Sequence, residues 1–117
     1  MGKRILIVDD SSIMRKMIRE TLTSGGHEVI GEAKNGADAV ALYQDLNPDL
    51  ITMDITMRGM DGLAAAKEIL ELDKSAHIIF FSNLDEEKYS QDVKEIGAKG
   101  YVNKHNQSEI LKLIDRL

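Results

Sequence analysis

The 117-residue sequence has no cysteine, no tryptophan and a single proline. Without cysteine the chain cannot form disulfide bonds, use a thiolate nucleophile or bind a metal through sulfur, and such a composition is compatible with a reducing compartment. The sequence also lacks linkers, low-complexity tracts and internal repeats. Because its length is close to the commonest domain size, we expect residues 1–117 to form one domain.

Basic clusters and long apolar segments are equally scarce. The formal net charge is -5 and no run of basic residues exceeds two, so direct binding to nucleic acid is not expected. No stretch approaches the roughly 20 apolar residues that a membrane span needs. The four aliphatic residues from Ile5 to Val8 are too few for a signal peptide. These features predict a cytoplasmic protein that does not insert into membranes.

Short apolar runs alternate with longer amphipathic segments along the chain. The runs are rich in β-branched or aromatic residues and are bounded by Gly, Asp or Asn, as strands are. They predict strands over Arg4–Val8, Glu28–Glu32, Leu50–Asp54, Ile78–Ser82 and Gly100–Val102. Helical periodicity predicts a first helix whose apolar stripe includes Met14 and Leu22. Further helices are predicted from Asn35 to Leu46, Asp61 to Leu72, Glu86 to Ile96, and Asn106 to the C-terminus.

Local signals mark several helix ends. Gly25-Gly26 supplies left-handed backbone after the first helix, and Asn47 precedes proline, which disfavours helical geometry. Asn106, followed three positions later by Glu109, indicates a capping box for the last helix. The repeated β-α alternation predicts an α/β fold in which helices cover both faces of a parallel sheet.

Polar side chains end or follow four of the five predicted strands. Asp9 and Asp10 follow the first apolar run, Asp54 and Ser82 end the third and fourth strands, and Lys104 follows the last. In an open α/β sheet ligands bind beyond the carboxyl ends of the strands, so these groups are expected at one edge. An aspartate after a strand is often only a helix cap, and this interpretation applies to each aspartate taken alone. The joint pattern favours a functional site.

Three converging carboxylates repel one another unless a cation shares the site. Mg²⁺ prefers octahedral oxygen coordination and is usually held by one or two carboxylates and a phosphate. Asp10 and Asp54 suit direct binding, Asp9 would bind through water, and a backbone carbonyl near Thr56 would complete the shell. We therefore predict a magnesium site.

The same arrangement suits phosphoryl transfer, because a carboxylate is a competent nucleophile toward phosphorus. Asp54 is the single aspartate at the end of its strand and is the predicted phosphoacceptor. Lys104 would approach the transferring group from the other side, and the Ser82 hydroxyl would hydrogen-bond a phosphoryl oxygen. Such transfer depends mainly on positioning and electrostatics.

These residues also carry a resemblance to a known family. Ile5–Ser11, Met53–Met57 with Met60–Gly62, Ser82 and Gly97–Lys104 resemble the motifs of the response-regulator receiver family, in order and at the usual spacing. The resemblance covers essentially the whole chain, and its first 22 residues look most like those of single-domain chemotaxis regulators. It implies a flavodoxin-like fold, with five parallel strands in the order 2-1-3-4-5 and five helices.

The resemblance implies a role for each site residue. Asp54 matches the phosphoacceptor, Asp9 and Asp10 the acidic pair, Lys104 the invariant lysine, Ser82 the switch hydroxyl, and Tyr101 the aromatic residue that moves inward on phosphorylation. In the family a sensor histidine kinase donates the phosphoryl group, and the domain catalyses its own phosphorylation and hydrolysis. A downstream protein then binds the surface formed by the last strand and the fourth and fifth helices.

Three positions depart from the family pattern. Arg58 replaces the usual proline and adds a positive charge near the site. Asn83 replaces a small residue after the switch hydroxyl and would narrow the access of an attacking water. His105 replaces the proline that usually follows the lysine in a cis peptide. Because a cis bond without proline costs about 2.5–4 kcal/mol, we expect a trans peptide after Lys104.

Other interpretations stay open. Thr56 and Leu84 are expected to tune the hydrolysis rate, although simple packing also explains Leu84. The departures allow a binding module that no longer switches, and residues 100–106 also resemble receivers attached to DNA-binding domains. A metal-dependent phosphatase acting on a small substrate is least favoured, since no second cluster offers a general acid.

Methionine and histidine carry weaker signals. Met14 and Met17 are expected to fill gaps in the core, as methionine commonly does. His27, His77 and His105 lie far apart in the sequence and lack the spacing of metal ligands, so we expect them on the surface or in loops.

Overall fold

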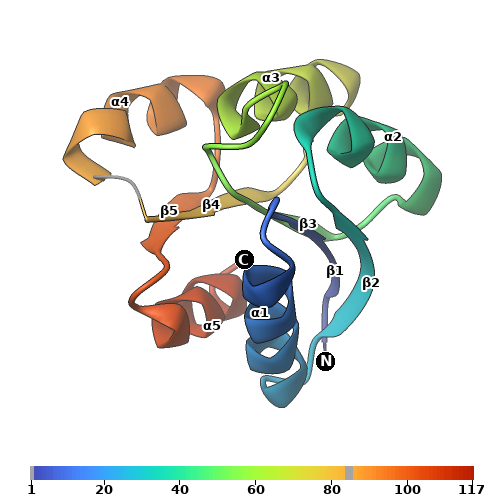
Figure 1. Cartoon of the computed structure of the whole chain (residues 1–117), viewed down its shortest axis with the longest axis vertical. Coiled ribbons are helices and arrows are strands. Elements are labelled where there is room, and N and C mark those ends of the chain that lie inside the picture. Colours follow the sequence, from blue (N-terminus) through green and yellow to red (C-terminus); the bar gives the residue numbers. More distant parts are fainter. Residues whose placement is uncertain (1, 84–85) are drawn as a thin grey trace.

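The computed structural model describes residues 2–83 and 86–117, with only the backbone described for residues 86–90. Five strands alternate with five helices, as the sequence predicts (Figure 1). The strands are β1 (Arg4–Val8), β2 (Glu28–Ala33), β3 (Leu50–Met53), β4 (Ile78–Ser82) and β5 (Gly100–Asn103). The helices are α1 (Ser12–Ser24), α2 (Gly36–Leu46), α3 (Gly62–Leu72), α4 (Glu86–Ile96) and α5 (Gln107–Asp115).

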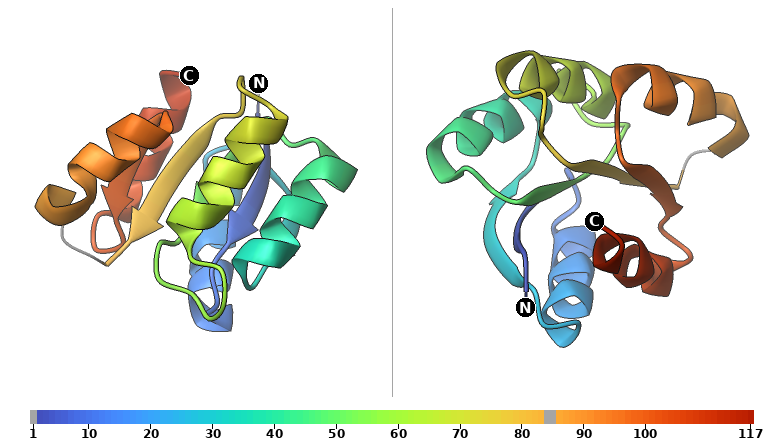
Figure 2. Two further views of the ribbon diagram at one scale, coloured as in Figure 1. Left: turned by 90° about the horizontal axis from the view of Figure 1, so that it is seen from above. Right: turned by 180° about the vertical axis from the view of Figure 1, so that it is seen from behind.

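All five strands are parallel and follow the order β2-β1-β3-β4-β5. The doubly wound topology that the family resemblance implies is therefore confirmed. Helices α1 and α5 cover one face of the sheet, and α2, α3 and α4 cover the other (Figures 1 and 2). Strand order reverses beside β1, which places the carboxyl ends of β1 and β3 at the position where such folds bind ligands.

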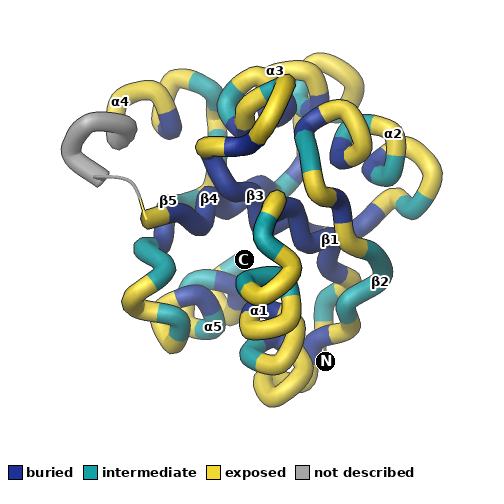
Figure 3. Tube along the Cα trace, in the orientation of Figure 1, coloured by how far each residue is buried: buried dark blue, intermediate teal, exposed yellow. Residues whose placement is uncertain are grey.

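Alternation along the buried strands divides the core into two clusters. On β1, Ile5 and Ile7 pack under α1 and α5, whereas Leu6 and Val8 pack under the other three helices. Both faces are covered, so β1, β3 and β4 are almost completely buried (Figure 3). This explains why these strands are continuous apolar runs rather than alternating ones.

Several predicted boundaries differ by one residue. β3 ends at Met53, so Asp54 lies just beyond the strand, and β2 and β5 each continue one residue further than predicted. α3 begins at Gly62, because the Asp61 carboxylate caps the helix by accepting a hydrogen bond from the Ala64 N–H at 2.8 Å. Side-chain capping and strand pairing, rather than apolar pattern, set these ends.

Two predictions of local structure were wrong in detail. The capping box at α5 does not form: Asn106 makes no side-chain capping bond, and its backbone carbonyl accepts the Glu109 N–H at 3.0 Å instead. Of Gly25-Gly26, only Gly26 has a positive φ, +86°; Gly25 has φ -84°. Helix α1 nevertheless stops at this pair, as predicted.

The methionine prediction was partly wrong, whereas the prediction that the three histidines lie on the surface or in loops is confirmed. Met14 is half-buried against the cluster under α1 and α5, but Met17 is 41% exposed because it lies on the outer side of α1. His27, His77 and His105 all lie outside helices and strands. His27, however, is buried, and its Nδ1 accepts a hydrogen bond from the Lys3 N–H at 3.1 Å.

Among the helices of the described residues, none combines the length and the apolar composition that a membrane span requires.

Candidate functional site

Strand register brings the first and third strands to the site at the same level. β1 and β3 are neighbours, and Val8 pairs with Met53. The residues that follow these two, Asp9 and Asp54, therefore emerge at the same edge of the sheet. The Asp54 N–H donates to the Val8 carbonyl at 2.9 Å, which extends the pairing by one step. Both side chains are buried, Asp9 completely and Asp54 to all but 5% of its surface.

A third carboxylate completes an acidic cluster at this edge. Oxygen atoms of Asp9, Asp10 and Asp54 lie within 4.8 Å of one another, and Asp10 is the exposed member. Two buried carboxylates and one exposed carboxylate form a hard-oxygen donor set that is open on one side. This set fits Mg²⁺, which keeps several of its waters and accepts few protein ligands.

Lys104 neutralises part of this charge. Its Nζ lies 2.6 Å from Asp9 Oδ2 and 3.3 Å from Asp54 Oδ2, and only 8% of its side chain is exposed. The described residues contain no cis peptide bond, as expected for the peptide between Lys104 and His105. The Lys104 N–H donates to the Ser82 carbonyl at 3.0 Å. Pairing with β4 thus anchors the lysine backbone and aims its side chain at the carboxylates.

The charge balance shifts the titration of Asp54. Burial raises the pKa of Asp54 above its usual value, and the neighbouring Asp9 carboxylate raises it further, while Lys104 lowers it. Burial and the Asp9 charge together raise the pKa of Asp54 more than Lys104 lowers it, because desolvation and a neighbouring like charge both disfavour the charged carboxylate. A cation bound among the three carboxylates would oppose both.

The predicted switch residues lie on the two strands beyond β3. Ser82 ends β4 and is 1% exposed, and Tyr101 is half-buried on the adjacent strand β5. Asn83 is exposed directly after Ser82. Leu84, predicted to tune the hydrolysis rate, lies outside the described residues.

The loop after Asp54 carries the other predicted residues. Thr56 and Arg58 are both exposed in it. Arg58 lines a surface hollow together with Asp10, Ser11, Lys34 and Asn35, so its side chain and the exposed carboxylate border the same hollow.

Sequence reasoning assigned no role to two residues that hold the site together. A Cβ on Gly62 would lie 1.9 Å from the Asp54 carbonyl oxygen, and the Gly62 N–H donates to the Ile55 carbonyl at 2.7 Å. The Arg15 guanidinium donates to the Asp9 carbonyl at 2.7 Å and also pairs with Glu32. Gly62 was visible as part of a family motif, whereas nothing in the sequence pairs Arg15 with Asp9.

This fold, with a carboxylate cluster and a lysine at the point where strand order reverses, defines a flavodoxin-like domain with an acidic site. The chain belongs to the response regulator receiver family: the family profile described as "Response regulator receiver domain" matches residues 5–115.

Among its relatives are the chemotaxis proteins CheY of Bacillus subtilis and Thermotoga maritima. They are 45% and 42% identical to this chain, and each alignment covers at least 99% of this chain and 98% of the relative. The solved CheX-CheY-BeF3-Mg+2 complex from Borrelia burgdorferi matches with a TM-score of 0.91 and 35% identity, over 97% of this chain and 87% of that chain. The chain is thus a CheY-like receiver.

Proposed function

We propose that this domain accepts a phosphoryl group on Asp54 from a sensor histidine kinase and signals by changing its affinity for a protein partner. One observation carries the proposal: three carboxylates, two of them buried, have oxygens within 4.8 Å of one another, and a lysine lies 3.3 Å from Asp54. Burial alone would disfavour so many charges, so the arrangement supports a site that receives a cation and an anion.

Asp10 and Asp54 are the proposed direct ligands of Mg²⁺, with Asp9 acting through a water and the Thr56 carbonyl completing the shell. When bound, the ion supplies positive charge that offsets the carboxylates and the phosphoryl oxygens. Lys104 Nζ lies 2.6 Å from the Asp9 carboxylate. Lys104 therefore offsets part of the negative charge that the carboxylates place at this site.

In the proposed reaction an Asp54 oxygen forms a bond to phosphorus while the bond from phosphorus to the kinase histidine nitrogen breaks, and the nitrogen keeps the electron pair. The product is an aspartyl phosphate. Lys104 stabilises the charge on the phosphoryl oxygens, since its ammonium already faces Asp54. Hydrolysis later returns Asp54 to a carboxylate when water attacks the phosphorus.

Ser82 and Tyr101 are the proposed switch. Ser82 ends β4, the strand next to β3, so its hydroxyl is near enough in the fold to follow the phosphoryl group. Tyr101 lies on β5, at the edge of the surface formed by α4, β5 and α5. We assign the downstream partner to this α4-β5-α5 face. The CheY relatives support a partner in chemotaxis.

Phosphorylation is tested by mass. Incubation of the protein with Mg²⁺ and a small phosphodonor, acetyl phosphate, should add one phosphoryl group to the intact protein, and Asp54→Asn should abolish the gain. Asp45→Asn is the matched control, because Asp45 is an exposed aspartate on α2. A native protein that gains no mass under conditions that label a known receiver contradicts the proposal.

The lifetime of the phosphorylated state tests the role of Asn83. Its exposed position directly after Ser82 supports a part in admitting water. If Asn83 narrows the path of the attacking water, Asn83→Ala should shorten the lifetime in a time course of decay; an unchanged lifetime removes this role.

Arg58 and Asn83 also favour a second candidate, a binding module that no longer switches. That candidate gains support if phosphorylation leaves partner affinity unchanged.

A further inference from the structure

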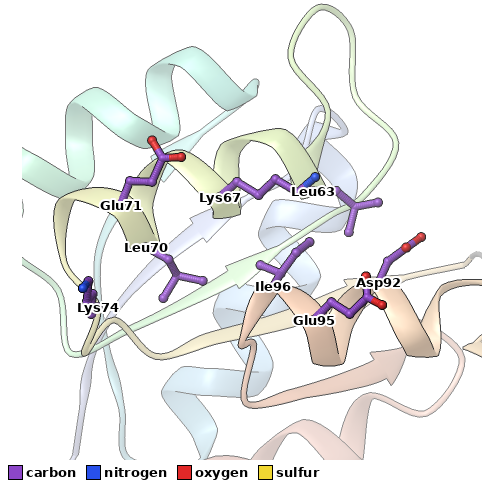
Figure 4. A pocket seen from close by; sticks show the side chains of 8 residues that line it. All are labelled: Leu63, Lys67, Leu70, Glu71, Lys74, Asp92, Glu95 and Ile96. Atoms are coloured by element: carbon purple, nitrogen blue, oxygen red, sulfur yellow. The ribbon is translucent and has the colours of Figure 1, made fainter.

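A groove separates α3 from α4 on the face of the sheet opposite α1 and α5 (Figure 4). Its apolar lining comes from Leu63 and Leu70 on α3 and from Ile96 on α4, which point toward the space between the helices. All three are half-buried and pack against the core cluster with their inner surfaces. The groove has a volume of about 590 Å³ and contains none of the carboxylates or switch residues described above.

The two walls of the groove carry different charges. Lys67 lies on α3 and Lys74 just beyond its end, while Asp92 and Glu95 lie on α4. All four side chains are exposed, and Glu71, the remaining charged residue of the α3 wall, points away from α4 (Figure 4). Within the described part of the chain, no ion pair joins the α3 wall to the α4 wall. The lysines of the α3 wall and the carboxylates of the α4 wall therefore face the groove without pairing across it.

We propose that the α3–α4 groove is a docking site for an amphipathic helix of a partner protein. Its apolar stripe would cover Leu63, Leu70 and Ile96. Acidic residues along one edge would meet the lysines of the α3 wall, and basic residues along the other would meet Asp92 and Glu95 of the α4 wall. Helices bind grooves between two helices in this manner, with apolar anchors inside and charges that fix orientation at the rim.

The dimensions and charges favour this occupant. An eleven-residue helix such as α3 is about 16 Å long at 1.5 Å per residue, so a partner helix of about three turns would follow the wall. A small apolar molecule would leave both charged rims without counterparts. A second copy of this chain is less well matched, since the net charge of -5 on each copy opposes association.

Both walls begin next to the proposed phosphorylation site. The first residue of α3, Gly62, packs so closely on Asp54 that an added Cβ would lie 1.9 Å from the Asp54 carbonyl oxygen. α4 begins four residues after Ser82 in the sequence. A change at Asp54 would therefore reach both walls, and groove affinity should depend on phosphorylation. This dependence, unlike the docking site itself, rests on the proposed function.

A designed peptide tests the site directly. The probe is a fluorescein-labelled peptide of about 15 residues, with leucines on one helical stripe, glutamates along one edge and lysines along the other. A second peptide has the same composition in scrambled order. Each is titrated against the full native chain, Lys67→Glu and Lys16→Glu; the last is a charge-matched control, because Lys16 is exposed on α1. Amide chemical shifts locate the bound peptide.

We expect the ordered peptide to bind at least about tenfold more tightly than the scrambled one, and Lys67→Glu to weaken it about tenfold, since like charges then meet. Lys16→Glu should leave the affinity unchanged. Exchanging the glutamate and lysine edges of the peptide should restore binding to the double variant Lys67→Glu/Asp92→Lys. Shifts should fall on α3 and the C-terminal half of α4.

Equal binding of both peptides, or shifts confined to α5 and β5, overturns the proposal. So does a dimer in sedimentation that Lys67→Glu abolishes, because the occupant is then a second copy. Phosphorylation is followed by mass in the same samples. An affinity unchanged after complete phosphorylation overturns the coupling, whereas a protein that gains no phosphoryl mass counts against the proposed function and leaves the peptide comparison to decide the docking site.

Discussion

The Lys104 ammonium lies 2.6 Å from the Asp9 carboxylate, closer than the 3.3 Å that separates it from Asp54. Both partners of the shorter pair have side chains that are at most 8% exposed. A lysine that pairs mainly with Asp9 holds positive charge beside Asp54, the proposed acceptor, without neutralising its carboxylate fully. This balance is consistent with the raised pKa of Asp54, which burial causes and Lys104 only partly opposes.

Removal of the lysine should destabilise the protein when Mg²⁺ is absent. Lys104→Met leaves two buried carboxylates without their counter-charge, and breaking a buried pair in this way costs about 3–5 kcal/mol. Urea unfolding in chelator should show a loss of this size, and added Mg²⁺ should recover more stability in the variant than in the native chain. A variant as stable as the native chain in chelator would show that the ion pair contributes no stability.

The stability of the metal-free protein should depend on pH through Asp54. Because the pKa of Asp54 is raised by folding, the folded chain binds a proton there more readily than the unfolded chain. The stabilisation from this site is therefore present in acid and is lost as the pH rises through the raised pKa. Asp54→Asn should unfold at a higher temperature than the native chain near neutral pH, and its advantage should shrink on acidification. Thermal unfolding across the acid range checks both points.

Two glycines of the same loop region should respond differently to alanine. Gly62→Ala places a methyl group 1.9 Å from the Asp54 carbonyl oxygen, so backbone must move, at a cost of about 1–3 kcal/mol or more. Gly59 has a φ of +77° and open space around a Cβ, so Gly59→Ala should cost only about 1 kcal/mol of left-handed strain. Only the first should also slow phosphorylation. Equal losses of stability for the two variants would contradict this account.

Magnesium affinity should depend on the exposed aspartate. Asp10→Asn removes one charge from the acidic cluster and should weaken Mg²⁺ binding by about tenfold or more, as loss of a ligand or its support commonly does. Asp45→Asn on α2 should leave the affinity unchanged. Calorimetric titration measures both, and an Asp10→Asn protein that binds Mg²⁺ as the native chain does would exclude Asp10 as a ligand.

The number, type and order of the elements were predictable because apolar runs and amphipathic segments alternate so regularly. What failed depended on side chains far apart in the sequence or on the exact turn of a helix. His27 lies in a loop as expected, but its burial and its hydrogen bond from the Lys3 N–H were not foreseen, and Met17 is exposed on α1 although it was expected in the core. The capping box at Asn106 failed because backbone bonds already satisfy that turn.

The carboxylate cluster was predictable from strand ends alone, since parallel strands of an open sheet release their last residues at one edge. The distances around Lys104 were not, because they depend on the pairing of its N–H with the Ser82 carbonyl. Close packing of Gly62 on Asp54 is likewise invisible without coordinates. Sequence thus indicated which groups meet, and three-dimensional packing determined how far apart they lie.

The most direct test of the central claim is to locate the phosphoryl group and its dependence on Mg²⁺ in one experiment. After reaction with acetyl phosphate, peptide mass spectrometry should find the added phosphoryl group on the peptide containing Asp54, and only when Mg²⁺ is present. A phosphoryl group found on Asp9, Asp10 or Asp61, or one that appears on Asp54 equally fast in chelator, would contradict the account.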